Sequence, residues 1–142
     1  MRSRKQTARL LGWLGVLPFA VMAGFAWLGG PGWLEHLLIG YGVLIVAFMG
    51  GTLWAAALVD GEMPEAPLIV SILLVLAALP ALLLPLVSAA LLLAVLFGLH
   101  WLAESVWVRN RQPGWYRHMR LGISMSVVAL LIATTVIEFG QL

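Results

Sequence analysis

His100 and Glu104 are the two residues of this sequence whose types and spacing could support chemistry. They lie four positions apart, so on a helix their side chains share one face. An imidazole beside a carboxylate could bind and release protons, and ionisable groups within a membrane are costly and often functional. Glu104 lies only about 7 Å of helix from Arg109, within reach of the basic stretch that follows. Two interpretations therefore stand: a proton or ligand site, or an internal ion pair beside a neutral His100.

The other reactive residue types do not form a catalytic set. The chain has no cysteine, which excludes disulfides and thiolate ligands. It also lacks a phosphate-binding loop, a zinc-binding His-Glu-x-x-His motif and a nucleophile elbow. We interpret Asp60, Glu62 and Glu65, in a turn with Pro64, as a solvated loop rather than a cation site. We expect a protein that is not an enzyme and has no metal and no cofactor.

The composition indicates that lipid, rather than water, surrounds the chain. Of its 142 residues, 63% are hydrophobic and only 10% are charged, and the mean hydropathy is +1.05. A soluble domain has about 25% charged residues. The net charge of +2 could suggest nucleic acid, but the basic residues form two clusters beside apolar segments. We therefore expect membrane lipids as partners and no nucleic acid.

Five apolar segments could cross a bilayer as helices, since a crossing needs about 20 residues. The predicted helices cover residues 10–28, 35–59, 67–84, 86–108 and 121–139, and the third is the shortest. A secretory signal is the alternative for the first segment, but its apolar run is long and includes Pro18. Pro18 is expected to kink this helix and free a carbonyl for Tyr41, Thr52 or a water molecule. Pro80 is expected to bend or end the third helix. The predicted fold class is all-α, a polytopic membrane bundle with residues 1–142 in a single domain.

The distribution of charge predicts the orientation. The two basic clusters comprise Arg2, Arg4, Lys5 and Arg9 in the first, and Arg109, Arg111, Arg117 and Arg120 in the second. Short loops rich in Lys and Arg stay in the cytoplasm, so four crossings must separate the clusters. This places the N-terminus inside and the C-terminus outside, in a bacterial cytoplasmic (inner) membrane. The tryptophans fit aromatic belts at both faces: Trp27 and Trp33 outside, and Trp13, Trp54, Trp101, Trp107 and Trp115 inside.

Small residues spaced four apart predict where helices meet, because they allow two backbones to approach closely in lipid. The second segment has Ala47, Gly51 and Ala55, and the fourth has Ala90, Ala94 and Gly98. We favour packing within the bundle for both stripes. The alternative is a docking face for a second copy of the chain or for another membrane subunit.

Three stretches together resemble domain-of-unknown-function family 3429, which includes transmembrane protein 69 of animals. They are LGWLGVLPF at residues 11–19, YGVLIVAFMGGTLW at residues 41–54 and WYRHMRL at residues 115–121. The family often has a polar or basic residue before the tryptophan of the second stretch, where this chain has Leu53. The resemblance implies a short bacterial or mitochondrial multi-helix membrane protein and transfers no activity. The shared residues suit a scaffold: Gly50 and Gly51 for close packing, and Trp54, Trp115, Tyr116, Arg117 and Arg120 for the inner interface and anionic headgroups.

The leading hypothesis is a non-enzymatic packing or accessory protein of a membrane complex. The alternative is a proton or small-solute transporter or channel that uses His100 and Glu104. A wet cavity reaching His100 would favour transport, whereas a dry His100 against Trp101 or Phe97 would favour the scaffold.

Overall fold

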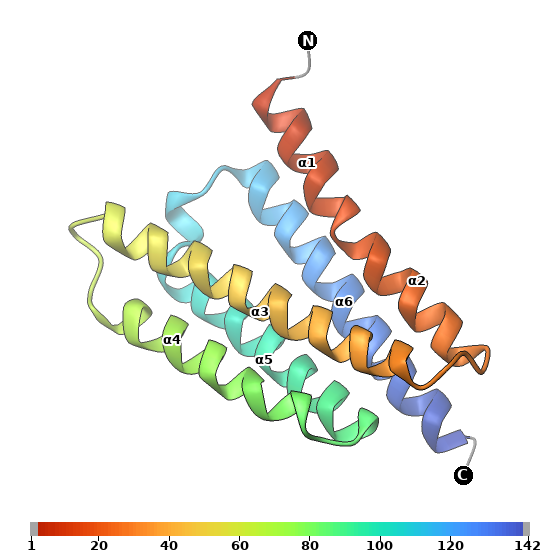
Figure 1. Ribbon diagram of the computed structural model, residues 1–142. Helices are drawn as coiled ribbons and strands as arrows, with labels where there is room; N and C mark the ends of the chain where they lie inside the picture. Colours follow the sequence, from red (N-terminus) through yellow and green to blue (C-terminus); the bar gives the residue numbers. More distant parts are fainter. Residues whose placement is uncertain (1–2, 141–142) are drawn as a thin grey trace.

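The computed structural model describes residues 3–140, and every regular element in that range is helical (Figure 1). The elements are α1 Arg4–Leu14, α2 Val16–Trp27, α3 Trp33–Val59, α4 Ala66–Ala78, the short 3-10 helix η1 Leu79–Leu82, α5 Leu86–Trp107, the 3-10 turn η2 Arg109–Arg111, and α6 Gly114–Gly140. Four stretches are long and apolar enough to cross a membrane, namely α1 with α2, α3, α5 and α6. The stretch Ala66–Leu82 is a shorter apolar helix. The predicted all-α membrane bundle is confirmed, and the chain is a multi-pass membrane protein.

The first crossing is interrupted where the sequence predicts a kink. Helix α1 ends at Leu14, four residues before Pro18, which has no N–H to donate to the Leu14 carbonyl. Helix α2 begins at Val16, directly after Gly15. Of the three predicted partners, Tyr41 bonds to a carbonyl at this break, but its hydroxyl donates at 2.5 Å to the Gly15 carbonyl rather than to the Leu14 carbonyl that Pro18 leaves without a donor. This bond fixes the kink against α3.

Two helices begin earlier than the sequence pattern indicates, because their first turns are polar. Helix α1 begins at Arg4 rather than at residue 10, where Ser3 and Gln6 form a capping box. Helix α6 begins at Gly114 rather than at residue 121, and the backbone N–H groups of Tyr116 and Arg117 donate to the Pro113 carbonyl. The predicted start of the last helix at residue 121 is therefore wrong, because the second half of the basic stretch is already helical.

The α-helical part of the third predicted segment is also shorter than expected. Helix α4 ends at Ala78, and Pro80 lies in the 3-10 helix that follows. The effect expected of Pro80 is thus present. Pro85 then precedes the first turn of α5, where a missing N–H does no harm.

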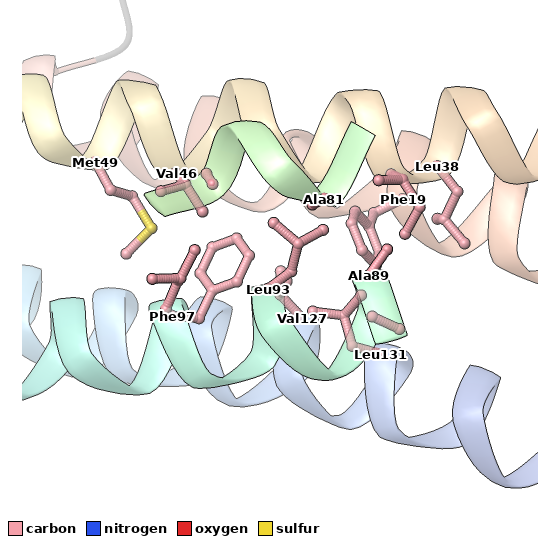
Figure 2. Close-up of a cluster of buried hydrophobic side chains, with 14 of the residues drawn as sticks. Phe19, Leu38, Val46, Met49, Ala81, Ala89, Leu93, Phe97, Val127 and Leu131 are labelled. Atoms are coloured by element: carbon pink, nitrogen blue, oxygen red, sulfur yellow. The ribbon is translucent and has the colours of Figure 1, made fainter. Parts of the chain in front are cut away.

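The buried core gathers side chains of α2, α3, α4 with η1, α5 and α6 (Figure 2). Phe19, Val46, Leu93, Phe97 and Leu131 are each almost completely buried there. Helix α3 packs on α2, α4 and α5, and α6 packs on α5, α2 and α1. The outward positions are equally apolar, because lipid tails solvate leucine as well as a protein interior does.

Two glycines of α3 allow close contact between helices. A β-carbon added at Gly42 would lie 2.7 Å from Leu93 Cδ1 of α5. One added at Gly50 would lie 2.6 Å from Val75 Cγ2 of α4. Real β-carbons do not approach other atoms this closely, so a side chain at either position would have to displace Leu93 or Val75, and glycine lets α3 pack closely on its neighbours.

Candidate functional site

The predicted pair lies on the inward face of α5. Leu93, Phe97, His100 and Glu104 follow one another at three- or four-residue spacing, and all four are buried. This face of α5 is therefore apolar over its middle turns and polar over its last two. The polar turns lie near the end of the bundle that holds α1, the turn at residues 60–65 and the segment at residues 108–117, called here the basic end (Figure 1).

Glu104 forms an ion pair with Arg120 of α6. Both side chains are about nine-tenths buried, with exposed fractions of 10% and 11%. Arg120 also lies over the ring of Tyr116, 5.9 Å from its centroid, and its Nη2 atom is 3.5 Å from Thr52 Oγ1. The pair thus links α5 and α6 with a contact to α3, at a depth where either charge alone would be poorly solvated.

His100 is the most deeply buried ionisable residue of this cluster, with 1% of its surface exposed. Its Nδ1 atom is 3.6 Å from Glu104 Oε1, which is longer than a hydrogen bond. Within residues 3–140 neither ring nitrogen has a hydrogen-bond partner. A cleft of about 370 Å³ reaches Trp101, Glu104 and Ser105 on the same helix, but His100 does not line it.

The two basic clusters meet at the basic end. Lys5 Nζ lies 5.5 Å from the ring centroid of Trp115, and the Arg9 guanidinium lies 5.7 Å from it. Trp115 in turn packs edge-on against Tyr116. These contacts join α1 to the first turn of α6, so segments far apart in the sequence form one basic surface.

Asp60 ties the α3–α4 turn to the same end. Its carboxylate pairs with Arg111, whose Nη1 atom also donates to the Trp107 carbonyl at 2.7 Å. The Glu62 backbone N–H donates to the other Asp60 oxygen at 3.0 Å. This backbone bond, followed by the Arg111 bond, holds the pKa of Asp60 below its usual range, because both stabilise the charged form. Across the described residues, no group of three or more His, Asp or Glu could hold a metal ion.

The comparison with protein families decides how this architecture is classified. The sequence model of the family described as "Protein of unknown function (DUF3429)" matches residues 4–136. The chain belongs to the DUF3429 family. Comparisons with curated proteins and with solved structures gave no match. The family assignment made from residues 11–19, 41–54 and 115–121 is confirmed, while the likeness to transmembrane protein 69 stays a prediction.

The predicted interface residues of this DUF3429 protein take different positions. Trp54 is exposed on α3, whereas Trp115 and Tyr116 are half-buried under the basic side chains. Arg120 points into the bundle toward Glu104, and Arg117 lies in the cleft between α5 and α6. Among these five residues, Arg117 is thus the arginine whose charge is available to a headgroup.

The small residues of the two predicted stripes divide between the inside and the outside of the bundle. Gly50 and Ala90 are buried, and Ala47 and Ala94 are half-buried. Gly51 and Gly98 are exposed, with no neighbour within 4 Å of an added β-carbon, and Ala55 is exposed as well. The stripes therefore leave helix backbone uncovered on the outer faces of α3 and α5.

Two of the contacts that sequence reasoning missed in this DUF3429 protein differ in the signal that the sequence offers. The first is Gly42 against α5; its signal is the four-residue repeat of Leu38, Gly42, Val46 and Gly50, which is displaced by one position from the stripe chosen. The second is the bond from the Trp27 indole to Thr134 Oγ1, at 3.1 Å. No local pattern indicates this bond, because 107 positions separate the two residues.

Proposed function

We propose that this DUF3429 protein is non-enzymatic and acts by binding, as a packing or accessory protein of a membrane complex. Its partner would be a transmembrane helix of another subunit or of a second copy of the chain. We further propose a bacterial cytoplasmic membrane as its location, with the N-terminus inside and the C-terminus outside.

The observation that carries this proposal is the exposed backbone at Gly51 on α3. The space beside its immediate neighbour Gly50 is occupied by the Val75 side chain of α4, whereas a β-carbon added at Gly51 would meet nothing within 4 Å. Ala55, one turn further, is exposed too. In lipid, helices associate where small residues let their backbones approach, rather than where leucines are exposed. This face therefore offers the geometry that a second helix needs.

The proton or solute pathway is supported less well. Glu104 is neutralised by Arg120, so its charge is already used within the bundle. The cleft at the basic end and the cavity beside Glu35 and His36 at the other end lie at opposite ends of α5. Buried Leu93 and Phe97 occupy the helix between them. His100 keeps the alternative open, because its two ring nitrogens have no partner among residues 3–140.

The orientation is supported by the meeting of the two basic clusters at one end, through Lys5, Arg9 and Trp115. Short basic segments on one side are retained in the cytoplasm. Because the chain has no cysteine, single cysteines at Gly32, Gly61 and Gly114 test the orientation directly. Only Gly32→Cys should react with an impermeant thiol reagent added outside. Reaction of Gly114→Cys from outside would reverse the proposed topology.

Binding is tested by gentle solubilisation from the native membrane and identification of what co-purifies. Gly51→Leu should release the partner, because it fills the face, and it should leave folding intact because the position is open. Gly98→Leu, at an equally open position on α5, tests the second uncovered face: loss of the partner in Gly51→Leu but not in Gly98→Leu would assign docking to α3. Ala55→Cys should form a disulfide-linked dimer if the partner is a second copy.

Two results would overturn the proposal. One is a chain that purifies alone from the native membrane and gives no dimer with Ala55→Cys. The other is a flux across reconstituted vesicles that disappears in His100→Ala, which would establish transport instead.

A further inference from the structure

The cleft between α5 and α6 at the basic end concentrates positive charge. It has a volume of about 370 Å³, and its lining includes Arg109, Gln112, Arg117 and Arg120 beside Glu104. The three arginines come from η2 and from the first two turns of α6. The early start of α6 is what brings Arg117 and Arg120 to the same cleft.

The arginines of this end differ in how their charges are balanced. Arg120 is paired with Glu104, and Arg111, which does not line the cleft, is paired with Asp60. Arg109 and Arg117 form no ion pair with any residue between 3 and 140. The Arg117 Nε atom is also buried without a hydrogen-bond partner in that range. The cleft thus contains two uncompensated guanidinium groups, and one has a buried donor that is unused.

We propose that this cleft binds the phosphate group of an anionic compound. Guanidinium groups bind phosphate oxygens through two parallel N–H bonds, and basic pockets between helices at the cytoplasmic side bind anionic headgroups. Arg117 supplies a guanidinium group that lines the cleft and forms no ion pair within residues 3–140, while Arg109 and the Gln112 amide supply further donors at the rim. The Glu104 carboxylate does not repel the anion, because Arg120 already neutralises it.

The rim of the cleft allows the phosphate to belong to a lipid. Trp101 and Leu121 line the cleft and are exposed, with 40% and 37% of their surfaces accessible. An acyl chain could lie along these apolar side chains while its headgroup occupies the cleft. A soluble phosphate ester would use the same donors. The site is separate from the outward face of α3, so it does not depend on the proposed docking there.

The test uses the full chain in detergent, with native mass spectrometry to measure bound lipid. The probes are phosphatidylglycerol, phosphatidylcholine with the same acyl chains, and glycerol 3-phosphate as a soluble competitor. We expect tighter binding of phosphatidylglycerol than of phosphatidylcholine. Arg117→Gln should weaken phosphatidylglycerol about tenfold, the usual effect of losing a charged hydrogen bond. Arg109→Gln should also weaken phosphatidylglycerol binding. Because the Arg109 side chain is exposed, misfolding would not explain that loss.

Arg111→Gln is the matched control, because it removes the same charge from the same end but outside the cleft. The affinity of this variant for phosphatidylglycerol should stay within about twofold of that of the unmodified chain, since Arg111 is already paired with Asp60. Competition by glycerol 3-phosphate would assign the site to soluble phosphate esters, whereas its failure beside selective phosphatidylglycerol binding would assign it to a lipid headgroup. Equal losses in Arg111→Gln and Arg117→Gln would overturn the proposal, as would equal binding of both lipids without binding of glycerol 3-phosphate.

Discussion

The two ends of the bundle bury polar groups in different ways. At the basic end, Glu104 and Arg120 form a charged pair between α5 and α6. At the opposite end, which holds the turns at residues 28–32 and 83–85 and the last turns of α6, the Trp27 indole donates to the Thr134 hydroxyl. The Thr134 hydroxyl in turn donates a hydrogen bond to the Leu130 carbonyl of its own helix at 2.8 Å. One end therefore relies on charge and the other on neutral donors and acceptors.

This difference teaches how each end responds to change. A buried charge that loses its partner has no inexpensive alternative, whereas a neutral group near the interface can reach water or another carbonyl. The charged end also holds Arg109 and Arg117, which form no ion pair within residues 3–140, and the cleft that they line. We therefore expect the most destabilising substitutions and the anion-binding site at the charged end. At the opposite end we expect substitutions of polar residues to cost less stability.

The largest effect is expected for Glu104→Gln. The substitution leaves the Arg120 charge buried without its carboxylate, which costs about 3–5 kcal/mol in comparable pairs. The free energy of unfolding in mixed micelles measures the loss. The double variant Glu104→Gln with Arg120→Gln is the control and should regain most of it, because no lone charge remains. A single variant within about 1 kcal/mol of the unmodified chain would mean that Arg120 can extend to the interface, as long basic side chains often do, and would remove the contrast between the ends.

Tyr41→Phe probes the junction between the ends, where α1 meets α2. Loss of the bond from its hydroxyl to the Gly15 carbonyl should lower the free energy of unfolding by about 1 kcal/mol. Tyr116→Phe is the matched control, because no hydrogen bond of its hydroxyl occurs within residues 3–140. Equal effects of the two variants would show that Pro18 and Gly15 hold the kink without help from Tyr41.

Thr134→Val tests the neutral end. It removes the acceptor of the Trp27 indole, and interhelical hydrogen bonds in membranes contribute on average about 0.6 kcal/mol. Thr135→Val is the control, since within residues 3–140 that hydroxyl bonds to the Leu131 carbonyl of its own helix and to no other helix. The same unfolding assay applies. A loss as large as that of Glu104→Gln would contradict the view that the opposite end is the tolerant one.

The sequence predicts the all-α class and the four long apolar stretches well, because apolar length is a direct physical requirement of a bilayer. It misplaces the starts of α1 and α6 because the first turns of these helices extend beyond the apolar runs. Their helicity comes from capping, from the Pro113 carbonyl and from packing on each other, none of which produces an apolar run.

The candidate site is predictable only in part, for a related reason. The spacing of His100 and Glu104 places them on one face, but it does not identify Arg120 as the partner, because that requires α6 to begin at Gly114. The two glycine stripes of α3 differ by one position, and both faces of the helix are apolar. In lipid, apolarity no longer distinguishes inside from outside, so the sequence alone does not determine that Gly50 is covered and Gly51 is not.

The smallest effect is expected at Asp60, on the solvent side of the charged end. Its pKa is lowered in the folded chain, so its pairing stabilises the fold above the ordinary Asp range of about 3.9 and is lost as the pH falls through the lowered value. The unfolding midpoints of Asp60→Asn and the unmodified chain should therefore differ at pH 7 and converge in acid. High salt should reduce the difference, because the pair with Arg111 is partly exposed. Glu65→Gln, in the same turn, is the control for the loss of a negative charge alone. If the difference for Asp60→Asn persists unchanged in acid, the charge of Asp60 is not what stabilises the turn.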